Sequence, residues 1–258
     1  MDKTVINKMK RQIVLAAHSA GEGHIPSAFS ILDLIWILYD RVMNFDVSRP
    51  NDIAMDRFIL SKGHASLALY SVLAVKGFFQ LEDLTTFCKY DSKFGGHADC
   101  NKLAGIEAST GSLGHGLPIS VGIALGSKIL KHDNRIFCLI GDGECNEGTV
   151  WESALLASHH ELSNLCCIVD FNHSTDRALK LGDLAGKFLS FGWEVITIQG
   201  HNHEEIYDAL THVPTHKPVA IIAETIKGYG IKRMENEPAW HHRAPNADEL
   251  NNILEELK

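Results

Sequence analysis

The sequence predicts an α/β fold, with a doubly wound, mostly parallel sheet that carries helices on both faces. Short apolar runs rich in Val and Ile recur along the 258 residues, and helical patterns separate them. The runs are continuously apolar rather than alternating, which is typical of strands covered on both faces. Repetition of strand, helix and strand requires right-handed crossovers, and these produce a parallel sheet.

The first 45 or so residues are expected to be helical, with a break at residues 21–26, where two glycines and a proline fall together. The strands follow this region, and several of them end at a turn that contains Gly or Asn. Apolar residues at helical spacing connect the strands, as in residues 151–158 and 206–210. The five expected strands are 58–61, 135–140, 166–171, 194–198 and 219–223.

The C-terminal region is expected to be a loop followed by a helix. Residues 227–247 show no periodicity and predict an ordered loop. Asp248 or a close neighbour then caps a short helix with apolar residues at helical spacing. No internal repeat, low-complexity tract or linker interrupts the chain, so we expect a single domain over residues 1–258.

Composition excludes several classes of function. There are 24 Lys and Arg residues against 32 Asp and Glu, so a net charge of −8 makes the chain a poor partner for nucleic acid or an anionic membrane. The strongest apolar run, 34–38, is far too short for a membrane span, and the N-terminus lacks the compact apolar segment of a secretory signal. Six cysteines without a CxxC motif predict reduced thiols and a cytoplasmic location.

Asp142 and Asn172 are the first candidate site residues. Each lies at or just past the carboxyl end of an expected strand, where open parallel sheets bind their ligands. One carboxylate and one amide oxygen suit Mg²⁺, which fills its other positions with phosphate oxygens and water. The pair predicts a diphosphate bridged by a metal, and the flanking Gly141 and Gly143 allow a sharp turn and a close approach of the ligand. The alternative is an ordinary strand-to-helix turn with capping Asp and Asn.

Histidines recur directly after a glycine, as at His24, His64 and His97. This pattern predicts imidazoles exposed on loops, where they could exchange protons between pH 5 and 8 and hydrogen-bond sugar hydroxyls. The adjacent His241 and His242 cannot easily share one tetrahedral zinc ion. Others are expected to be surface or satisfied core histidines, namely His159, His160, His201, His203 and His216.

The stretch from Gly141 to Asn172 closely resembles the thiamine-diphosphate signature of transketolases, in which Gly-Asp-Gly is followed some thirty residues later by Asn. Further segments similar to this family occur in the expected order over roughly residues 10–250. The resemblance implies the thiamine-diphosphate-binding fold. The segments are 23–24, 58–64, 95–97, 109–116, 191–193, 199–202, 225–230 and 240–245.

The resemblance also implies which residues bind. The metal, Mg²⁺ or another divalent cation such as Ca²⁺ or Mn²⁺, would be held by Asp142, Asn172 and the backbone carbonyl of Ser174. His24 and His97 would face the substrate, and a histidine of the pair at 241 and 242 would lie near the diphosphate and the reacting centre. Contacts to the cofactor are expected from His64, Gly111, Ser112, Leu113, Gly143, Asn172 and His241.

Glu147 is a separate case. The family places a glutamate here near the subunit contact, where it communicates with the activating glutamate of another domain. The alternative is a carboxylate at a helix N-terminus that is favoured by the helix dipole. We therefore include Glu147 with His24, His97, His241 and His242 among the candidate catalytic residues.

The resemblance covers only the first of the three domains of full-length transketolases. The pyrimidine-binding and C-terminal domains are expected on a separate chain, because no candidate for the activating glutamate is found here; Glu224 ends a strand that the family uses otherwise. The implied protein is the N-terminal subunit of a split transketolase, inactive alone and assembled as an α2β2 heterotetramer. Its reaction would transfer a two-carbon ketol unit from a ketose, expected to be phosphorylated, to an aldose.

Three departures from the family leave the donor and acceptor sugars open. The glycine-rich run of the family reads Gly23-His24-Ile25-Pro26-Ser27 here, His115 stands where Gln is common, and the run after Asn172 differs at Ser174. Two alternatives to a transketolase subunit remain. One is the alpha-type subunit of a 2-oxo acid decarboxylase or dehydrogenase first component, and the other is a non-catalytic cofactor-binding module.

Overall fold

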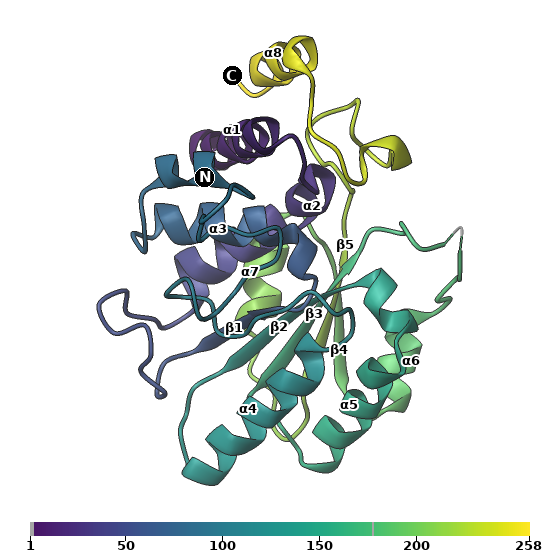
Figure 1. Ribbon diagram of the computed structural model, residues 1–258. Coiled ribbons are helices and arrows are strands. Elements are labelled where there is room, and N and C mark those ends of the chain that lie inside the picture. The colour runs from purple at the N-terminus through teal and green to yellow at the C-terminus, as the bar shows by residue number, and fades with distance from the viewer. Residues whose placement is uncertain (1–2, 177) are drawn as a thin grey trace.

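A computed structural model describes residues 3–176 and 178–258 and contains a five-stranded, entirely parallel sheet (Figure 1). The strand order is β1-β2-β3-β5-β4, which confirms the predicted parallel α/β fold. Chain order and strand order differ because β5 returns to lie between β3 and β4. The strands are β1 (Arg57–Leu60), β2 (Ile136–Gly141), β3 (Leu165–Phe171), β4 (Glu194–Gln199) and β5 (Val219–Glu224).

The strand residues alternate between two separate hydrophobic clusters. In β2, Phe137 and Leu139 join one cluster, whereas Ile136, Cys138 and Ile140 join the other. This alternation follows from the strand period of two, and every β2 residue is buried because both faces are covered. The continuous apolar run in the sequence therefore predicted the environment of this strand correctly.

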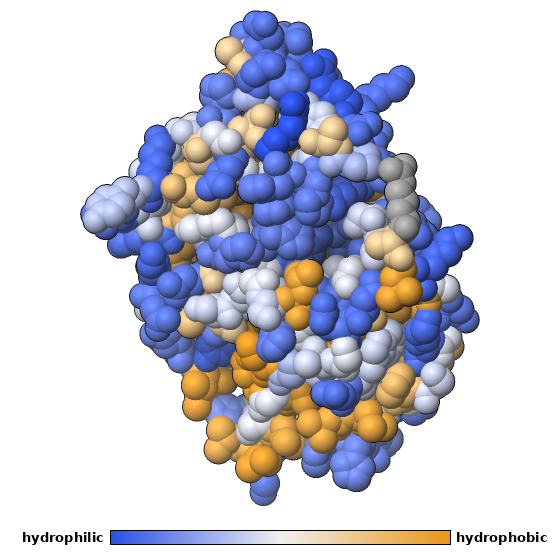
Figure 2. Space-filling view, turned by 45° about the vertical axis from the view of Figure 1, so that its right-hand side comes forward, coloured by the Kyte–Doolittle hydropathy of each residue, from blue (hydrophilic) through white to orange (hydrophobic). Residues whose placement is uncertain are grey.

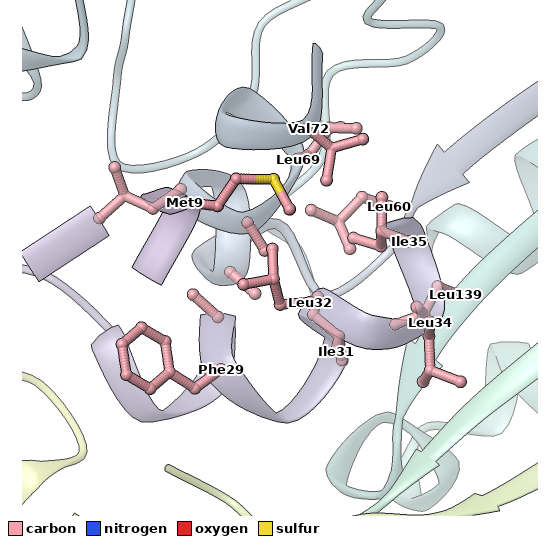
Figure 3. Packing of buried hydrophobic residues seen from close by; sticks show 14 of the residues in the cluster. Met9, Phe29, Ile31, Leu32, Leu34, Ile35, Leu60, Leu69, Val72 and Leu139 are labelled. Carbon is pink, nitrogen blue, oxygen red and sulfur yellow. The ribbon is translucent and has the colours of Figure 1, made fainter. Parts of the chain in front are cut away.

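Helices near both ends of the chain cover the first face. They bury apolar side chains that include Met9, Phe29, Leu32 and Leu69 against Leu60 and Leu139 of the sheet (Figure 3). Phe29 and Met9 are fully buried, so this layer forms a closed core. Its helices are α1 (Lys3–Ala20), α2 (Ile25–Ile37), α3 (Ser66–Val75) and α7 (His203–Thr211).

The second face is covered by α4 (Gly116–Leu130), α5 (Gly148–His159) and α6 (Leu184–Ser190). Trp193 is buried here and donates its indole N–H to the carbonyl of Ala154 at 2.8 Å. Figure 1 shows these three helices together, on the side of the sheet opposite to α1 and α3. The sheet is thus sandwiched between two helical layers.

Strand β4 differs from the prediction that all strands are covered on both faces. Thr197 is exposed, and Glu194, Val195 and Ile196 are only half-buried. Strand β4 lies at one edge of the sheet and pairs only with β5, but edge position alone is not the cause, because the other edge strand, β1, is buried from Phe58 to Leu60. Edge position depends on strand order, which the local sequence of β4 does not encode.

The predicted break and the C-terminal helix are both present. Helix α1 ends at Ala20, and α2 starts at Ile25 with Pro26 in its first turn; a short π-helical segment, Leu38–Val42, continues α2. Helix α8 (Ala247–Glu256) is capped by Asn246, whose side chain accepts the amide of Glu249 at 2.9 Å, so the cap is this neighbour and not Asp248. Among the described residues, no helix is both long and apolar enough to cross a membrane.

Candidate cofactor site

Four loops that follow strands meet at the carboxyl edge of the sheet. They follow β1, β2, β3 and β5, and the loops after β3 and β5, together with residues between 236 and 241, line a cavity of about 330 Å³. Parallel strands place their carboxyl ends at one edge, so residues far apart in sequence converge there. The cavity is lined by Asn172, His173, Ser174, Thr225, Lys227, Asn236, Glu237, Pro238 and His241.

The predicted metal ligands lie together at this edge. Asp142 and Asn172 are buried, and the backbone amide of Ser174 donates to the Oδ2 of Asp142 and to the Oδ1 of Asn172, both at 3.1 Å. One backbone amide therefore donates to two side-chain oxygens, which come from the ends of the successive strands β2 and β3. Ser174 approaches them through its amide, whereas the resemblance assigns its carbonyl as a ligand.

Asp170, on β3, fixes the orientation of Asn172. The Nδ2 of Asn172 donates to the Oδ2 of Asp170 at 2.8 Å, which leaves the amide oxygen of Asn172 facing the site. Asp170 is fully buried and also accepts from Ser30, Thr225 and Lys62. Burial alone would raise the pKa of Asp170, but Lys62 and these hydrogen bonds hold it below its usual range, so the carboxylate is ionised.

Asp142 and Lys227 have pKa values that the site shifts in opposite directions. Burial, followed by the charge of Asp170, raises the pKa of Asp142, so a cation bound beside this carboxylate would stabilise its ionised form. Burial and the nearby Lys62 lower the pKa of Lys227 to about 8. Its ammonium donates to the Nδ1 of His241 at 2.9 Å, which places a cation at the cavity wall.

The residues present fit a metal-bound diphosphate. Asp142 and Asn172 supply one carboxylate and one amide oxygen, the ligand types that Mg²⁺ shares with phosphate and water. A Cβ built on Gly143 would meet no atom within 4 Å, so the backbone after Asp142 is open to a ligand. Neither Gly141 nor Gly143 has a positive φ, however, so the turn itself does not require glycine, contrary to our expectation.

The loop that contains Gly111, Ser112 and Leu113 packs against His97. Gly111 has a φ of 150°, and a Cβ at this position would lie 3.0 Å from the His97 ring, so both conformation and space require glycine. Ser112 and Leu113 are exposed. The buried Glu144 holds the loop in place, because its carboxylate accepts the amide of Gly114 at 2.8 Å.

Four of the predicted histidines form one cluster around His24. The His242 ring stacks on His24 with 4.3 Å between the ring centroids, while His64 and His241 lie edge-on to it at 5.0 and 5.4 Å. His97 is exposed next to this cluster, and its charge contributes to the pKa of His24. The structure therefore brings both members of the pair at 241 and 242 to the site.

The pKa values of this cluster differ from the prediction of proton exchange between pH 5 and 8. Burial, followed by the neighbouring histidines, lowers the pKa of His24 to about 4. Burial and the charge of Lys62 lower the pKa of His64 to about 2. Both rings are therefore neutral over that pH range and act as hydrogen-bonding groups, because a charge on either would be poorly solvated.

Glu147 lies at the N-cap position of α5. Its side chain is exposed and makes no capping hydrogen bond with α5. Its Cβ is close to the Gly111–Gly114 loop, since a Cβ on Gly114 would lie 2.6 Å from it. Its position at the N-terminus of α5 matches the alternative of a carboxylate favoured by the helix dipole, although it makes no capping hydrogen bond.

Four charged residues of the site were not singled out from the sequence: Lys62, Glu144, Asp170 and Lys227. Each lies within a segment that resembles the family, but none has a motif of its own. The best available signal was Asp170, a single carboxylate in an otherwise apolar strand, which is rare unless the charge is paired. Its partners come from distant loops, so the sequence alone could not name them.

Comparison with known proteins gives the same family. Residues 1–257 match the family described as transketolase, thiamine diphosphate binding domain. A relative from Actinobacillus succinogenes, a subunit of apulose-4-phosphate transketolase, is 39% identical over 255 residues, covering 96% of this chain and 92% of the relative. The 6-deoxy-6-sulfo-D-fructose transketolase subunit of a Clostridium species is 38% identical over 229 residues, covering 86% and 83%.

A solved transketolase from Campylobacter jejuni has a TM-score of 0.88 at 30% identity; the similarity covers 99% of this chain and 43% of that one. The chain thus spans about two fifths of the length of the solved transketolases. These relatives favour the transketolase interpretation over a 2-oxo acid decarboxylase or a non-catalytic module. The chain belongs to the transketolase family, as a thiamine-diphosphate-binding domain.

Proposed function

We propose that this chain is the N-terminal subunit of a thiamine-diphosphate-dependent transketolase. With a second subunit it transfers a two-carbon ketol unit from a phosphorylated ketose to an aldose. The observation that carries this proposal is the convergence of Asp142 and Asn172 with Lys227 at the carboxyl edge of the sheet, beside the histidine cluster around His24. Relatives that are named as transketolase subunits support it.

In this mechanism the residues of the chain bind the metal and the cofactor and orient them. Asp142, Asn172 and the Ser174 carbonyl would hold Mg²⁺, and Lys227 would offset the charge of the diphosphate. Cofactor contacts are assigned to His64, Gly111, Ser112, Leu113, Gly143, Asn172 and His241. When bound, thiamine diphosphate supplies the chemistry that breaks and forms the carbon–carbon bond.

Substrate contacts are assigned to His24 and His97, together with His241 and His242. Because His24 is neutral above a pKa of about 4, its ring can both donate and accept a hydrogen bond at neutral pH. That suits the hydroxyl groups of a sugar, which also donate and accept. The stacked His242 holds the plane of the His24 ring, so the direction of this contact is fixed.

The partner subunit is proposed to carry the pyrimidine-binding domain and the activating glutamate, with Glu147 near the contact. We further propose that residues 1–258 form one domain and that the assembly is an α2β2 heterotetramer. Exposed apolar side chains on α4, α5 and α6 support an assembly, because they remain uncovered in the isolated chain (Figure 2). They are Ile119, Ile129, Leu130, Leu155, Leu156 and Leu189, from 38% to 71% exposed.

A cytoplasmic location is proposed from the cysteines. All six are free thiols, and Cys138, Cys145, Cys166 and Cys167 are buried. Burial raises the pKa of each of these four thiols, which keeps them protonated and unreactive. A reducing compartment is where such unpaired cysteines are ordinarily found.

The test is reconstitution of this chain with its partner, Mg²⁺ and thiamine diphosphate, followed by assays of two-carbon transfer between ketoses and aldoses. Asp142→Ala should lose metal-dependent cofactor binding and activity together, because it removes the one carboxylate of the metal set. Asp133→Ala is the matched control, since Asp133 is exposed in the loop that precedes β2, at the opposite edge of the sheet.

The outcomes distinguish the candidate functions. Failure to move a two-carbon unit between any ketose and aldose tested would reject the proposal. Release of CO₂ from pyruvate by the reconstituted pair would instead support a 2-oxo acid decarboxylase. Cofactor binding that survives Asp142→Ala would reject the metal set even if the enzyme is active.

A further inference from the structure

A buried carboxylate on α2 lies outside the site but is connected to one of its loops. Asp33 is 4% exposed, and its Oδ2 lies 2.9 Å from the Nδ1 of His201. Its other oxygen lies 2.7 Å from the Nε2 of His203. Burial alone would raise the pKa of Asp33, but hydrogen bonds from the two histidines outweigh it and bring the pKa to about 2, so Asp33 is ionised.

The other ring nitrogen of His201 contacts the backbone. Its Nε2 accepts the amide N–H of Ile226 at 3.0 Å, which requires that this nitrogen carries no proton. The ionised Asp33 can only accept, so the Nδ1 of His201 must carry the proton. Contacts on both sides of the ring therefore impose one tautomer, the neutral Nδ1–H form.

Ile226 lies between two residues of the cofactor site. Thr225, on one side, donates its hydroxyl to Asp170, which orients Asn172. Lys227, on the other side, places its ammonium at the cavity beside His241. The peptide that joins Thr225 to Ile226 is thus held by His201 at the point where the loop enters the site.

Further contacts hold the same loop at Lys227 and beyond it, and at Lys227 the carbonyl accepts the amide of Asn236 at 2.8 Å. The amide of Gly228 donates to the carbonyl of Pro26 at 3.0 Å, and the buried Lys10 donates to the carbonyl of Tyr229 at 2.7 Å. The Tyr229 ring stacks on His201 with 3.6 Å between the centroids. On the N-terminal side of Lys227 the loop is therefore fixed by His201, which holds the Ile226 amide, and by the hydrogen bond of Thr225 to Asp170.

We propose that Asp33 and His201 are positioning residues: Asp33 holds His201 in the Nδ1–H tautomer, so that its Nε2 fixes the Ile226 amide and thereby places Lys227 against the diphosphate of the cofactor. The role of Lys227 in this statement rests on the proposed function. The tautomer and the anchoring of the loop depend only on the contacts of the chain itself.

The first measurement needs no activity and no variant of the site. Ring ¹⁵N shifts of the full chain labelled at histidine report which nitrogen of each imidazole is protonated, and His201→Phe assigns the signals of His201. We expect Nδ1 to be protonated and Nε2 to be bare at neutral pH. A His201 protonated on Nε2 would overturn the proposal.

The second measurement tests the effect on the site. His201→Phe keeps a ring that can stack on Tyr229 but removes the acceptor, so backbone hydrogen exchange in residues 225–229 should accelerate at least tenfold. In the reconstituted enzyme the apparent Kd for thiamine diphosphate should rise about tenfold, with kcat at saturating cofactor changed less than threefold. His201→Gln, which can present an acceptor oxygen to Ile226, should recover most of the affinity.

The matched control is His212→Phe. His212 also pairs with a carboxylate, Glu194 at 2.8 Å, but at the far end of α7. His212→Phe should leave backbone hydrogen exchange in residues 225–229 and the Kd for thiamine diphosphate unchanged. If His201→Phe behaves like His212→Phe, the positioning role is rejected. If it changes exchange but not the cofactor Kd, the loop is anchored as described and the assignment of Lys227 to the cofactor is what fails.

Discussion

The two helical layers of this molecule cover the same sheet but differ in how they meet solvent. On the first face, none of the described residues of α1, α2 and α3 is a large hydrophobic side chain left exposed. On the second face, the outer sides of α4 and α5 expose Ile129 at 71% and Leu155 at 61%. Figure 2 shows the hydrophobic colour concentrated in the lower part of the molecule, where α4 and α5 lie in Figure 1.

The first layer buries its large apolar side chains within the chain, whereas the second leaves several of them exposed, as the proposed assembly requires. A helix that is apolar on its inner side only is stable at a surface, as α1 is. Helix α4 is apolar on its outer side as well, where Ile119 and Leu130 add to Ile129. Contiguous exposed apolar surface of this kind marks a contact with another protein. The four variants below test whether the layers really differ, in order of decreasing effect on stability.

The largest effect is expected in the closed layer. Phe29 is fully buried in α2, so Phe29→Ala should lower the free energy of unfolding by about 4 kcal/mol, through lost burial and the cavity that remains. Urea denaturation of the isolated chain measures this. Leu155→Ala in the open layer is the control and should cost less than about 0.5 kcal/mol. Equal losses for the two variants would remove the distinction between the layers.

The closed layer also buries a charge pair, and breaking it should have the next largest effect. Lys62→Met leaves the fully buried Asp170 without its cation and should cost about 3 kcal/mol at neutral pH. The control is Lys258→Met, because the ion pair of Lys258 with Glu255 is exposed and should contribute less than about 1 kcal/mol. Similar unfolding midpoints in urea for both variants would contradict the assignment of Asp170 as an ionised, buried group.

A smaller, pH-dependent effect is expected from His64, which directly precedes α3. Its folded pKa of about 2 lies below the ordinary histidine value of about 6.5, so the unfolded chain binds the proton more readily at intermediate pH. The contribution of His64 to stability is therefore intact above pH 6.5 and declines as the pH falls toward 2. Between pH 6.5 and 5.5, His64→Asn should remove up to about 1 kcal/mol of this decline.

Urea denaturation at a series of pH values measures the effect of His64→Asn. The exposed His216 provides the control, and His216→Asn should leave the slope of stability against pH unchanged. The prediction would be wrong if the wild-type chain lost no stability as the pH is lowered from 6.5. That result would show that His64 binds a proton in the folded state.

The smallest effect on stability, but a large one on assembly, is expected on the open layer. Leu155→Ser should change the free energy of unfolding of the isolated chain by less than about 0.5 kcal/mol, because the side chain is 61% exposed. It should weaken assembly about tenfold if α5 lies in a contact, as measured by sedimentation velocity with the partner subunit. The exposed Val213 is the control, since it lies beyond α7 on the other face.

The sequence predicted the environment of the central strands well and that of strand β4 poorly. Strands β2, β3 and β5 are buried on both sides, so their apolar runs are continuous and easily recognised. Strand β4 contains Thr197 among its apolar residues and pairs on one side only. The pairing of β4 with β5 is a property of the complete sheet, and it could not be read from six residues.

For the candidate site, the sequence could predict which residues lie there but not the pKa values of those residues. Asp142 and Asn172 could be found because strand ends predict where polar side chains collect. The pKa of His24 could not, since it depends on His242, which is more than two hundred residues away in sequence. The same applies to His201, expected to be an ordinary satisfied histidine, whose partners Asp33 and Ile226 come from two other elements.

The convergence of four strand-end loops also has a consequence for folding. Lys62 and Lys227 lie more than one hundred and sixty residues apart in the chain, and both reach the site only when β1 and β5 have joined the same sheet. Contacts of such long sequence separation form slowly and late. A ligand of this site should therefore bind the native state but no partly folded intermediate. Each tenfold excess of free cofactor over its Kd should then add about 1.4 kcal/mol to global stability, and cofactor supply would decide how much of the chain survives in a cell.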